Sequence, residues 1–555
     1  MNLTVFRVSF LCVAAASSAV AAPVLISNVH GYTLADGQLQ QFDALAFDAG
    51  KVLATGSRSA LSAKFPQAQT IDGGGNTLLP GLIDAHGHVT ALGELGTQVG
   101  LFETKSLQEA QARIKAFAAA SPGRPWIEGG GWNQVNWKLG RFPTAADLDA
   151  AVADRPVVLA RVDGHAVWLN SKALRAAGID KNSKDPEGGR IERNAQGDAT
   201  GILLDNAQAL LQSVIPARTD AERRSNLTAA LANMSSVGLT SVGDAGVEAG
   251  EVALYRRFAD EGLLSVRIYA MILDTGADFK ALSKHGPLIG YGNDHLTVRA
   301  VKLISDGALG SRGAAMLAPY SDQANQLGLL RMSAPVMEEK IQTALAAGYQ
   351  VNVHAIGDAA NRQVLDGFEA AYKAVGGRQL RNRIEHAQIV APSDIQRFKQ
   401  LDLIASMQPT HATSDMNMAQ DRIGAERLKG AYAWRTFLAQ GTLIAGGSDF
   451  PVESDNPFFG LYSAVTRMDH SGNPKGGWHS EQAMTLLEAF RAFTLDAAFA
   501  QRQEKSLGTL QPGKWADFIV VDRDLFKIPA ADIWKIKVKQ TWVGGSKVFD
   551  ASASK

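Results

Sequence analysis

Residues 298–307, "VRAVKLISDG", combine the pattern of a buried strand with a charged side chain. The valines, leucine and isoleucine form a short apolar run that ends at the polar Asp306, as in a strand of a parallel sheet. Lys302 stands inside this run, where removing its ammonium group from water is costly. The stretch therefore predicts a buried strand whose lysine has a function or a buried partner.

Seven further short apolar segments follow the same plan, and many of them also end in a polar residue. They are "LLPGLIDAHGH" (ending at His88), "GLTSVGDAG" (238–246), "SVRIYAMI" (265–272), "YQVNVHAIGD" (349–358), "NRIEHAQ" (382–388), "LIASMQP" (403–409) and "TLIAGGSDFP" (442–451). Helical patterns such as "APVMEEKIQTALAAG" and "APSDIQRFKQL" lie between many of them. Alternating strands and helices form a parallel sheet, and eight such units predict a closed α/β barrel of the (β/α)8 TIM type.

Two parts of the chain interrupt this alternation. Segment 91–236 separates the first barrel strand (79–90) from the rest of the barrel (237–500) and is far longer than a loop, so we expect an inserted domain. The two ends, 22–78 and 501–555, alternate like antiparallel strands with glycine turns. We expect these ends to pair into one composite β-sandwich beside the barrel.

Residues 1–21 have the pattern of a signal peptide. Arg7 precedes the apolar run 8–16, and Ala-Val-Ala at 19–21 supplies small residues for cleavage. The run is shorter than the about 20 apolar residues that a spanning helix needs. The pattern predicts a periplasmic or secreted protein without a membrane anchor after cleavage, and without a disulfide because Cys12 is the only cysteine. Lys+Arg and Asp+Glu each number 55, so charge gives no reason to expect nucleic acid as a partner.

Six side chains suited to metal binding stand at the carboxyl ends of the predicted strands, where barrel active sites are built. They are His86, His88, Lys302, His354, His386 and Asp449. His86 and His88 are two residues apart on a strand, so both side chains lie on one face. Imidazoles with a carboxylate suit zinc, although nickel, iron, manganese or cobalt could bind the same set. We expect a divalent metal site, with two zinc ions per chain.

Such a site provides a hydrolytic mechanism. A metal-bound hydroxide would be nucleophilic near neutral pH, and Asp449 could act as the general base that passes the proton to the leaving group. Two interpretations of Lys302 stay open from its position alone. Its neutral amine could add carbon dioxide, giving a carbamate that bridges two metals, or the lysine could extend to the barrel mouth or pair with Asp306.

Longer motifs resemble those of the amidohydrolase superfamily, namely "PGLIDAHGH" and "SLGTLQPGKWADFIVVDRD". More narrowly, amidohydrolase family 3, which includes the N-substituted formamide deformylases, is similar in "RVDGHAVWLNSKAL", "VKLISDGALGSRGA", "VHAIGDAAN", "RIEHAQ" and "GSDFPVESDNPFFG". The resemblance covers about residue 26 to about residue 524. It implies that His86 and His88 bind one metal and that His354 and His386 bind a second. It also implies that Lys302 is the bridging ligand and that Asp449 is both ligand and general base.

Five further residues are candidates for substrate binding. Asp163 and His165, in "RVDGHAVWLN" of the insertion, could reach over the barrel mouth or form a structural turn. Trp132 could be an aromatic wall or plain packing, and Arg312 an anion site or a surface ion pair. His411, after the seventh strand, is a candidate for contact with substrate.

Together these patterns predict an exported metal-dependent hydrolase that acts on the C–N bond of a small-molecule N-acyl or N-formyl amide. An esterase, lactonase or phosphotriesterase could use the same hydroxide, and a periplasmic binding protein without turnover is a third alternative. The intact Asp449 argues against the last, because a binding protein needs no proton shuttle. The insertion or the sandwich could provide an interface for a homo-oligomer.

Overall fold

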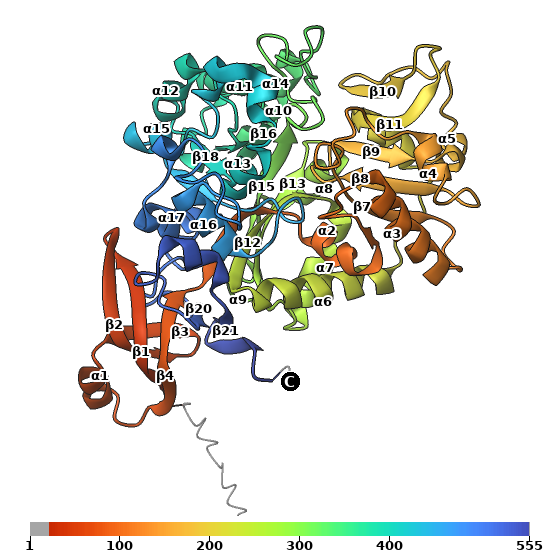
Figure 1. Cartoon of the computed structure of the whole chain (residues 1–555). Coiled ribbons are helices and arrows are strands. Elements are labelled where there is room, and N and C mark those ends of the chain that lie inside the picture. Colours follow the sequence, from red (N-terminus) through yellow and green to blue (C-terminus); the bar gives the residue numbers. More distant parts are fainter. Residues whose placement is uncertain (1–21, 554–555) are drawn as a thin grey trace, which may run out of the picture.

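The computed structural model describes residues 22–553, and its largest part is a barrel of parallel strands (Figure 1). The strand order is β19-β18-β17-β16-β15-β13-β12-β5, and the short β14 (Leu288–Gly290) pairs antiparallel with β15. The bounds are β5 (Leu82–Gly87), β12 (Leu239–Val247), β13 (Arg267–Leu273), β15 (Leu296–Ile304), β16 (Gln350–Ala355), β17 (Arg383–His386), β18 (Ile404–Met407) and β19 (Ile444–Gly446). The predicted barrel is confirmed, whereas the predicted signal peptide, residues 1–21, lies outside the described residues.

Buried polar contacts connect the first and last strands of the barrel. The Asp449 N–H donates to the His86 carbonyl oxygen at 2.7 Å. Asp84, fully buried on β5, accepts the Ser448 hydroxyl at 2.6 Å and the Ser448 N–H at 3.1 Å. These bonds hold the residues that follow β19 beside β5, and they bring His86 and Asp449 together.

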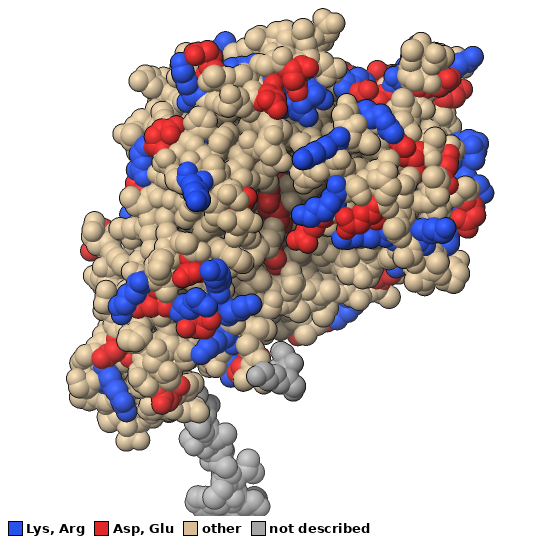
Figure 2. All heavy atoms as spheres, in the orientation of Figure 1, with Lys and Arg blue, Asp and Glu red and all other residues tan. Residues whose placement is uncertain are grey.

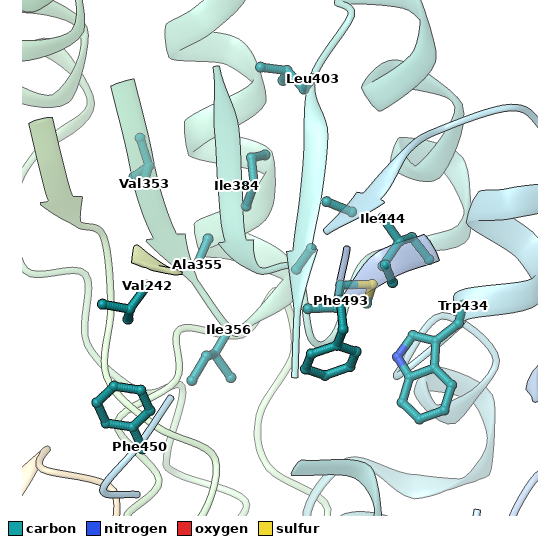
Figure 3. Close-up of a cluster of buried hydrophobic side chains, with 14 of the residues drawn as sticks. Val242, Val353, Ala355, Ile356, Ile384, Leu403, Trp434, Ile444, Phe450 and Phe493 are labelled. Carbon is teal, nitrogen blue, oxygen red and sulfur yellow. The ribbon is translucent and has the colours of Figure 1, made fainter. Parts of the chain in front are cut away.

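Helices surround the barrel and share its hydrophobic core. Their bounds are α2 (Val89–Glu94), α6 (Asp220–Ser236), α7 (Ala249–Asp260), α8 (Ala277–Leu282), α9 (Tyr291–Asp294), α10 (Ala334–Ala346), α11 (Asp358–Val375), α12 (Pro392–Gln400), α13 (Pro409–Asp415), α14 (Ala419–Leu428), α15 (Trp434–Ala439), α16 (Pro457–Thr466), α17 (Leu486–Ala492) and α18 (Leu495–Ala500). In α11, Val364, Phe368 and Ala371 recur at three- and four-residue intervals, so one stripe of the helix is buried. Figure 3 shows part of this core, including Ile384 of β17 and Trp434 of α15. In the part of the chain that the structure describes, no helix is long and apolar enough to cross a membrane.

The two ends of the chain build one β-domain beside the barrel (Figure 1). Its sheet has the order β22-β21-β20-β4-β1-β2-β3, in which β20 pairs antiparallel with β4. The bounds are β1 (Val24–Ala35), β2 (Gln38–Asp48), β3 (Lys51–Gly56), α1 (Arg58–Lys64), β4 (Gln69–Pro80), β20 (Phe518–Val521), β21 (Val538–Val543) and β22 (Ser546–Asp550). The rings of Phe47 in β2 and Trp542 in β21 have centroids 6.1 Å apart, although three strands separate β2 from β21 in this order. The sheet therefore folds over its own apolar core, which gives the predicted composite sandwich.

The insertion after the first barrel strand contains a sheet of its own, with the order β10-β11-β9-β8-β7-β6. The bounds are β6 (Val99–Gly100), α3 (Leu107–Ala120), β7 (Ile127–Trp132), α4 (Ala145–Asp149), β8 (Val157–Arg161), β9 (Ala166–Leu169), α5 (Ser171–Ala176), β10 (Gly189–Arg193) and β11 (Ala199–Asp205). Its side chains form two hydrophobic clusters separate from that of the barrel, whereas α2 and α6 pack in the barrel core. The face drawn in Figure 2 is hollowed between this domain and the barrel.

Candidate metal centre and active site

Three of the predicted metal ligands meet in the mouth of the barrel. His86 lies near the end of β5, His386 ends β17, and Asp449 follows β19. One donor atom from each lies within 4.8 Å of the others, and all three residues are buried. Imidazole nitrogens with a carboxylate oxygen are donors that zinc and related divalent metals bind, so this set fits a metal ion.

The other two predicted histidine ligands border this cluster. The rings of His354 and His386 have centroids 4.5 Å apart. Burial, and then the charge of His386, lower the pKa of His354 well below its usual value, so its imidazole is neutral. His354 Nε2 lies 3.3 Å from Asp306 Oδ1 but makes no hydrogen bond to any described residue, and an orphaned buried nitrogen suits a metal ligand. His88 is partly exposed, and its Nε2 lies 3.0 Å from Asp449 Oδ1.

Lys302 faces the same cluster from β15. Its Nζ lies 3.0 Å from His86 Nε2, and the side chain is buried. Burial lowers the pKa of Lys302 to about 8, against the opposing charges of Glu385 and Asp449. Asp306 accepts three backbone N–H groups at 2.8 to 3.0 Å instead of pairing with Lys302. The amine of Lys302 therefore faces the metal-binding side chains and does not pair with Asp306.

Asp449 connects the candidate ligands with the adjoining cavity. Its Oδ1 lies 3.4 Å from His86 Nε2, and its Oδ2 lies 3.6 Å from His411 Nε2. Burial would raise the pKa of Asp449, but hydrogen bonds from His86 and His88 outweigh it and hold the pKa well below its usual value. The φ of Asp449 is 61° and that of His386 is 72°, both in the left-handed region. Such conformations cost about 1–3 kcal/mol in non-glycine residues and occur preferentially at functional sites.

Two buried residues that the sequence did not single out orient the ligand histidines. Glu385 Oε2 lies 2.5 Å from His86 Nδ1, and Glu385 Oε1 lies 2.9 Å from Arg383 Nε. Gln408 Oε1 lies 2.8 Å from His386 Nδ1. Partners of this kind fix the tautomer and the direction of a metal-binding imidazole. Glu385 directly precedes His386 in "RIEH", which is the only signal that the sequence offers for it.

The insertion domain places Asp163 and His165 over the barrel mouth. The rings of His165 and His354 have centroids 4.9 Å apart, and His165 Nδ1 lies 2.8 Å from Asp205 Oδ1. Asp163 pairs with Arg161 and accepts the His165 N–H at 3.2 Å. A cavity of about 460 Å³ runs from the metal-binding residues to the insertion and is lined by both Asp163 and His165. His165 is thereby close enough to the candidate centre to contact a substrate, and so is His411, whose Nε2 lies 3.6 Å from Asp449 Oδ2.

Trp132 and Arg312 lie away from these residues. Trp132 is fully buried in the core of the insertion, where its Nε1–H donates to the Leu159 carbonyl oxygen at 2.8 Å. Arg312 donates from Nη2 to Asp322 Oδ2 at 2.8 Å. Neither lines a cavity at the metal-binding residues. The aromatic-wall and anion-site interpretations are therefore replaced by packing for Trp132 and by an ion pair for Arg312.

Comparisons with known proteins agree with this geometry. The amidohydrolase family model matches residues 69–549. YtcJ of Bacillus subtilis (strain 168), which carries the name of an amidohydrolase, is 32% identical over 522 residues, covering 92% of this chain and 96% of its own. The N-substituted formamide deformylase of Arthrobacter pascens is 27% identical over 551 residues, covering 96% of this chain and 99% of its own.

Two solved structures of uncharacterized metal-dependent hydrolases are similar over nearly the whole chain. The Pyrococcus furiosus protein is 30% identical with a TM-score of 0.71, covering 91% of this chain and 100% of its own. The Pyrococcus horikoshii protein is 27% identical with a TM-score of 0.74, covering 92% of this chain and 99% of its own. Both structures share the fold of this chain, and both carry the name of a metal-dependent hydrolase, which agrees with a metal-binding site in the barrel mouth.

Proposed function

We propose that this chain, which belongs to the amidohydrolase family, is an exported metal-dependent hydrolase that cleaves the C–N bond of an N-acyl or N-formyl amide. The cluster of His86, His386 and Asp449 within 4.8 Å is the observation that carries the proposal. The name of the formamide deformylase relative supports the C–N bond as the target. Export rests on the sequence of residues 1–21 alone.

The metal would be held by the buried cluster together with His88, His354 and Lys302. A bound divalent cation acidifies a water molecule and polarises a carbonyl oxygen. We propose zinc, with two ions per chain, and a carbamate formed when Lys302 Nζ adds carbon dioxide and loses a proton. A pKa of about 8 supports this, because the neutral fraction of the amine near physiological pH is then far larger than for a lysine in water.

Asp449 is the proposed general base. Its carboxylate is ionised at neutral pH because its pKa lies well below the usual value. It can take a proton from the attacking water and return it to the nitrogen of the leaving amine. His165 approaches from the insertion and can donate a hydrogen bond to the carbonyl oxygen of the substrate, where negative charge develops during attack.

Matched amides and esters test this function. Chelator-stripped and zinc-reloaded protein would be assayed with N-formyl and N-acetyl amides and with the esters of the same acids, and metal content would be measured by elemental mass spectrometry. We expect about two metals per chain and amide hydrolysis that depends on metal. Hydrolysis of the esters alone would replace the proposal with an esterase or lactonase. Absence of all turnover in folded, metal-replete protein would favour a binding protein.

A further inference from the structure

A second cavity, of about 210 Å³, opens beside the candidate metal centre. His386 and Asp449 line one part of it, and Asp415 and Glu453 line another. We call this space the acidic cavity, and Figure 2 shows acidic side chains inside the hollow between the barrel and the insertion domain. A substrate whose reacting bond lies at Asp449 can thus extend toward these carboxylates.

Helix α13 directs several polar side chains into the acidic cavity. His411 and Asp415 are four residues apart and lie on one face of the helix, with Ser414 beside them. Asp415 Oδ2 accepts hydrogen bonds from Gln388 Nε2 at 2.9 Å and from the Tyr432 hydroxyl at 2.7 Å. These bonds fix the carboxylate, although neither donor carries a positive charge.

Glu453 and Asp415 have no cationic partner. Glu453 Oε1 accepts the Ser414 hydroxyl at 2.5 Å, and neither carboxylate forms an ion pair with any Lys, Arg or His in residues 22–553. Burial raises the pKa of both groups although the charge of His411 lowers it, and the charge of Asp415 raises the pKa of Glu453 further. Two neighbouring carboxylates without an ion pair are unfavourable in the free protein, and a bound cation would relieve that cost.

Arg161 does not neutralise these two carboxylates. Among the residues described as lining the acidic cavity, it is the one lysine or arginine. Its Nη1 pairs with Asp163, its Nε donates to Gln134 Oε1 at 2.9 Å, and its Nη2 donates to Asn133 Oδ1 at 3.1 Å. The guanidinium is therefore already paired with Asp163, and it forms no ion pair with Asp415 or Glu453.

His411 provides a second sign that this cavity receives a ligand. The residue is 9% exposed, lines the cavity and has no hydrogen bond at Nε2 within the described part of the chain. A buried nitrogen left without a partner is rare in native structures and often marks a place for a bound group. This nitrogen lies 3.6 Å from Asp449 Oδ2, and His411 lines the same cavity as the two carboxylates.

We propose that the acidic cavity binds a protonated amine of the substrate, so that the enzyme prefers amides that carry an ammonium group. Asp415 and Glu453 would pair with the ammonium group, and His411 would contact the polar atoms between it and the reacting bond. This inference rests on the amide hydrolysis proposed above. An ammonium group offers hydrogen bonds in three directions, which suits two carboxylates on different segments of the chain.

Pairs of substrates that differ in a single charge test the inference. N-acetyl-diaminoalkanes would be compared with N-alkylacetamides in which a methyl group replaces the ammonium group, over several chain lengths. Amides of ω-amino acids and of the corresponding alkanoic acids would place the charge on the acyl side. We expect kcat/KM to be at least about tenfold higher for the charged member in one series, as for a hydrogen bond to a charged group in a partly buried site. An equal or higher value for the neutral member in both series would overturn the inference.

Two variants locate the preference. Asp415→Asn and Glu453→Gln should each reduce the ratio of kcat/KM for the charged amide to that for the neutral amide by about tenfold. The control variants Asp421→Asn and Glu426→Gln change exposed carboxylates of α14 and should retain the ratio. An unchanged ratio in Asp415→Asn and Glu453→Gln would refute the site.

If neither amide is hydrolysed, the proposed function fails, and calorimetric binding then decides this inference. Tighter binding of the charged amide that is lost in Asp415→Asn supports it, and equal binding of both amides contradicts it.

Discussion

Replacing Glu385 by glutamine is expected to destabilise the barrel and to weaken metal binding. Glu385 lies 2.5 Å from His86 Nδ1 and 2.9 Å from Arg383 Nε, and all three side chains are fully buried. Burial raises the pKa of Glu385, but Arg383 and His86 lower it more, so the group is ionised throughout the working pH range. The substitution preserves shape but removes the charge, which leaves Arg383 without its partner. Loss of one member of a buried ion pair costs about 3–5 kcal/mol.

The same substitution replaces the charged acceptor that fixes the His86 ring by a neutral amide. Loss of such a partner typically lowers metal affinity by about 10–100-fold. Zinc retained after dialysis against graded chelator would measure affinity, and urea unfolding of metal-free protein would measure stability. Glu504→Gln is a matched control, because Glu504 pairs with Arg381 at 2.7 Å but is partly exposed, and it should cost less than about 1 kcal/mol. Equal chelator resistance and equal unfolding for Glu385→Gln and the control would refute the role of Glu385.

Three further predictions concern other parts of the site. Asp449→Asn should reduce kcat of the metal-replete enzyme by about 10²–10⁴-fold with an unchanged circular dichroism spectrum, and near-normal turnover would exclude Asp449 as the base. The pKa of Lys302 is about 8 in the folded chain, whereas the usual value for lysine, expected in the unfolded chain, is 10.5. Between these two pH values the unfolded chain binds more protons than the folded chain. The contribution of Lys302 to the free energy of unfolding therefore increases as pH rises from about 8 to 10.5. Urea unfolding of metal-free Lys302→Met across that range should lack this rise; an unaltered pH dependence would contradict the assignment. Trp132→Phe should cost about 1–3 kcal/mol in stability through the lost bond to Leu159, yet leave relative kcat/KM among amides unchanged, and altered preference would restore its role as a substrate wall.

The barrel could be predicted because its sequence signals are local. Each strand is a short apolar run, and position along the run determines which side chain reaches the mouth. Lys302, His354 and His386 were found by that reasoning, without knowledge of which strands are neighbours. The composite sandwich was also predictable from alternation at both ends, although the folding of its sheet over Phe47 and Trp542 depends on long-range contacts.

The orientation of particular side chains could not be predicted in the same way. Regular alternation would place Glu385 and His386 on opposite faces of β17. The positive φ of His386 breaks that alternation, so that both side chains reach the metal-binding residues. The role of Trp132 is ambiguous in the sequence, because an aromatic residue after three glycines fits the wall of a substrate site or a hydrophobic core equally well. Only the tertiary structure shows that the Trp168 ring packs against it, with centroids 6.2 Å apart.

The arrangement of the site separates the residues that support chemistry from those that select a substrate. The candidate ligands lie on or directly after barrel strands, and the contacts between Asp84 and Ser448 hold the first and last of these strands together. His165 and Asp415, in contrast, come from the insertion and from α13, which form no part of the barrel sheet. Changes in those segments can alter the shape and charge of the cavities without moving His86 or Asp449. Relatives that share the barrel and its ligands can therefore differ in substrate. In this chain, the carboxylates of the acidic cavity are the groups most directly suited to select the substrate.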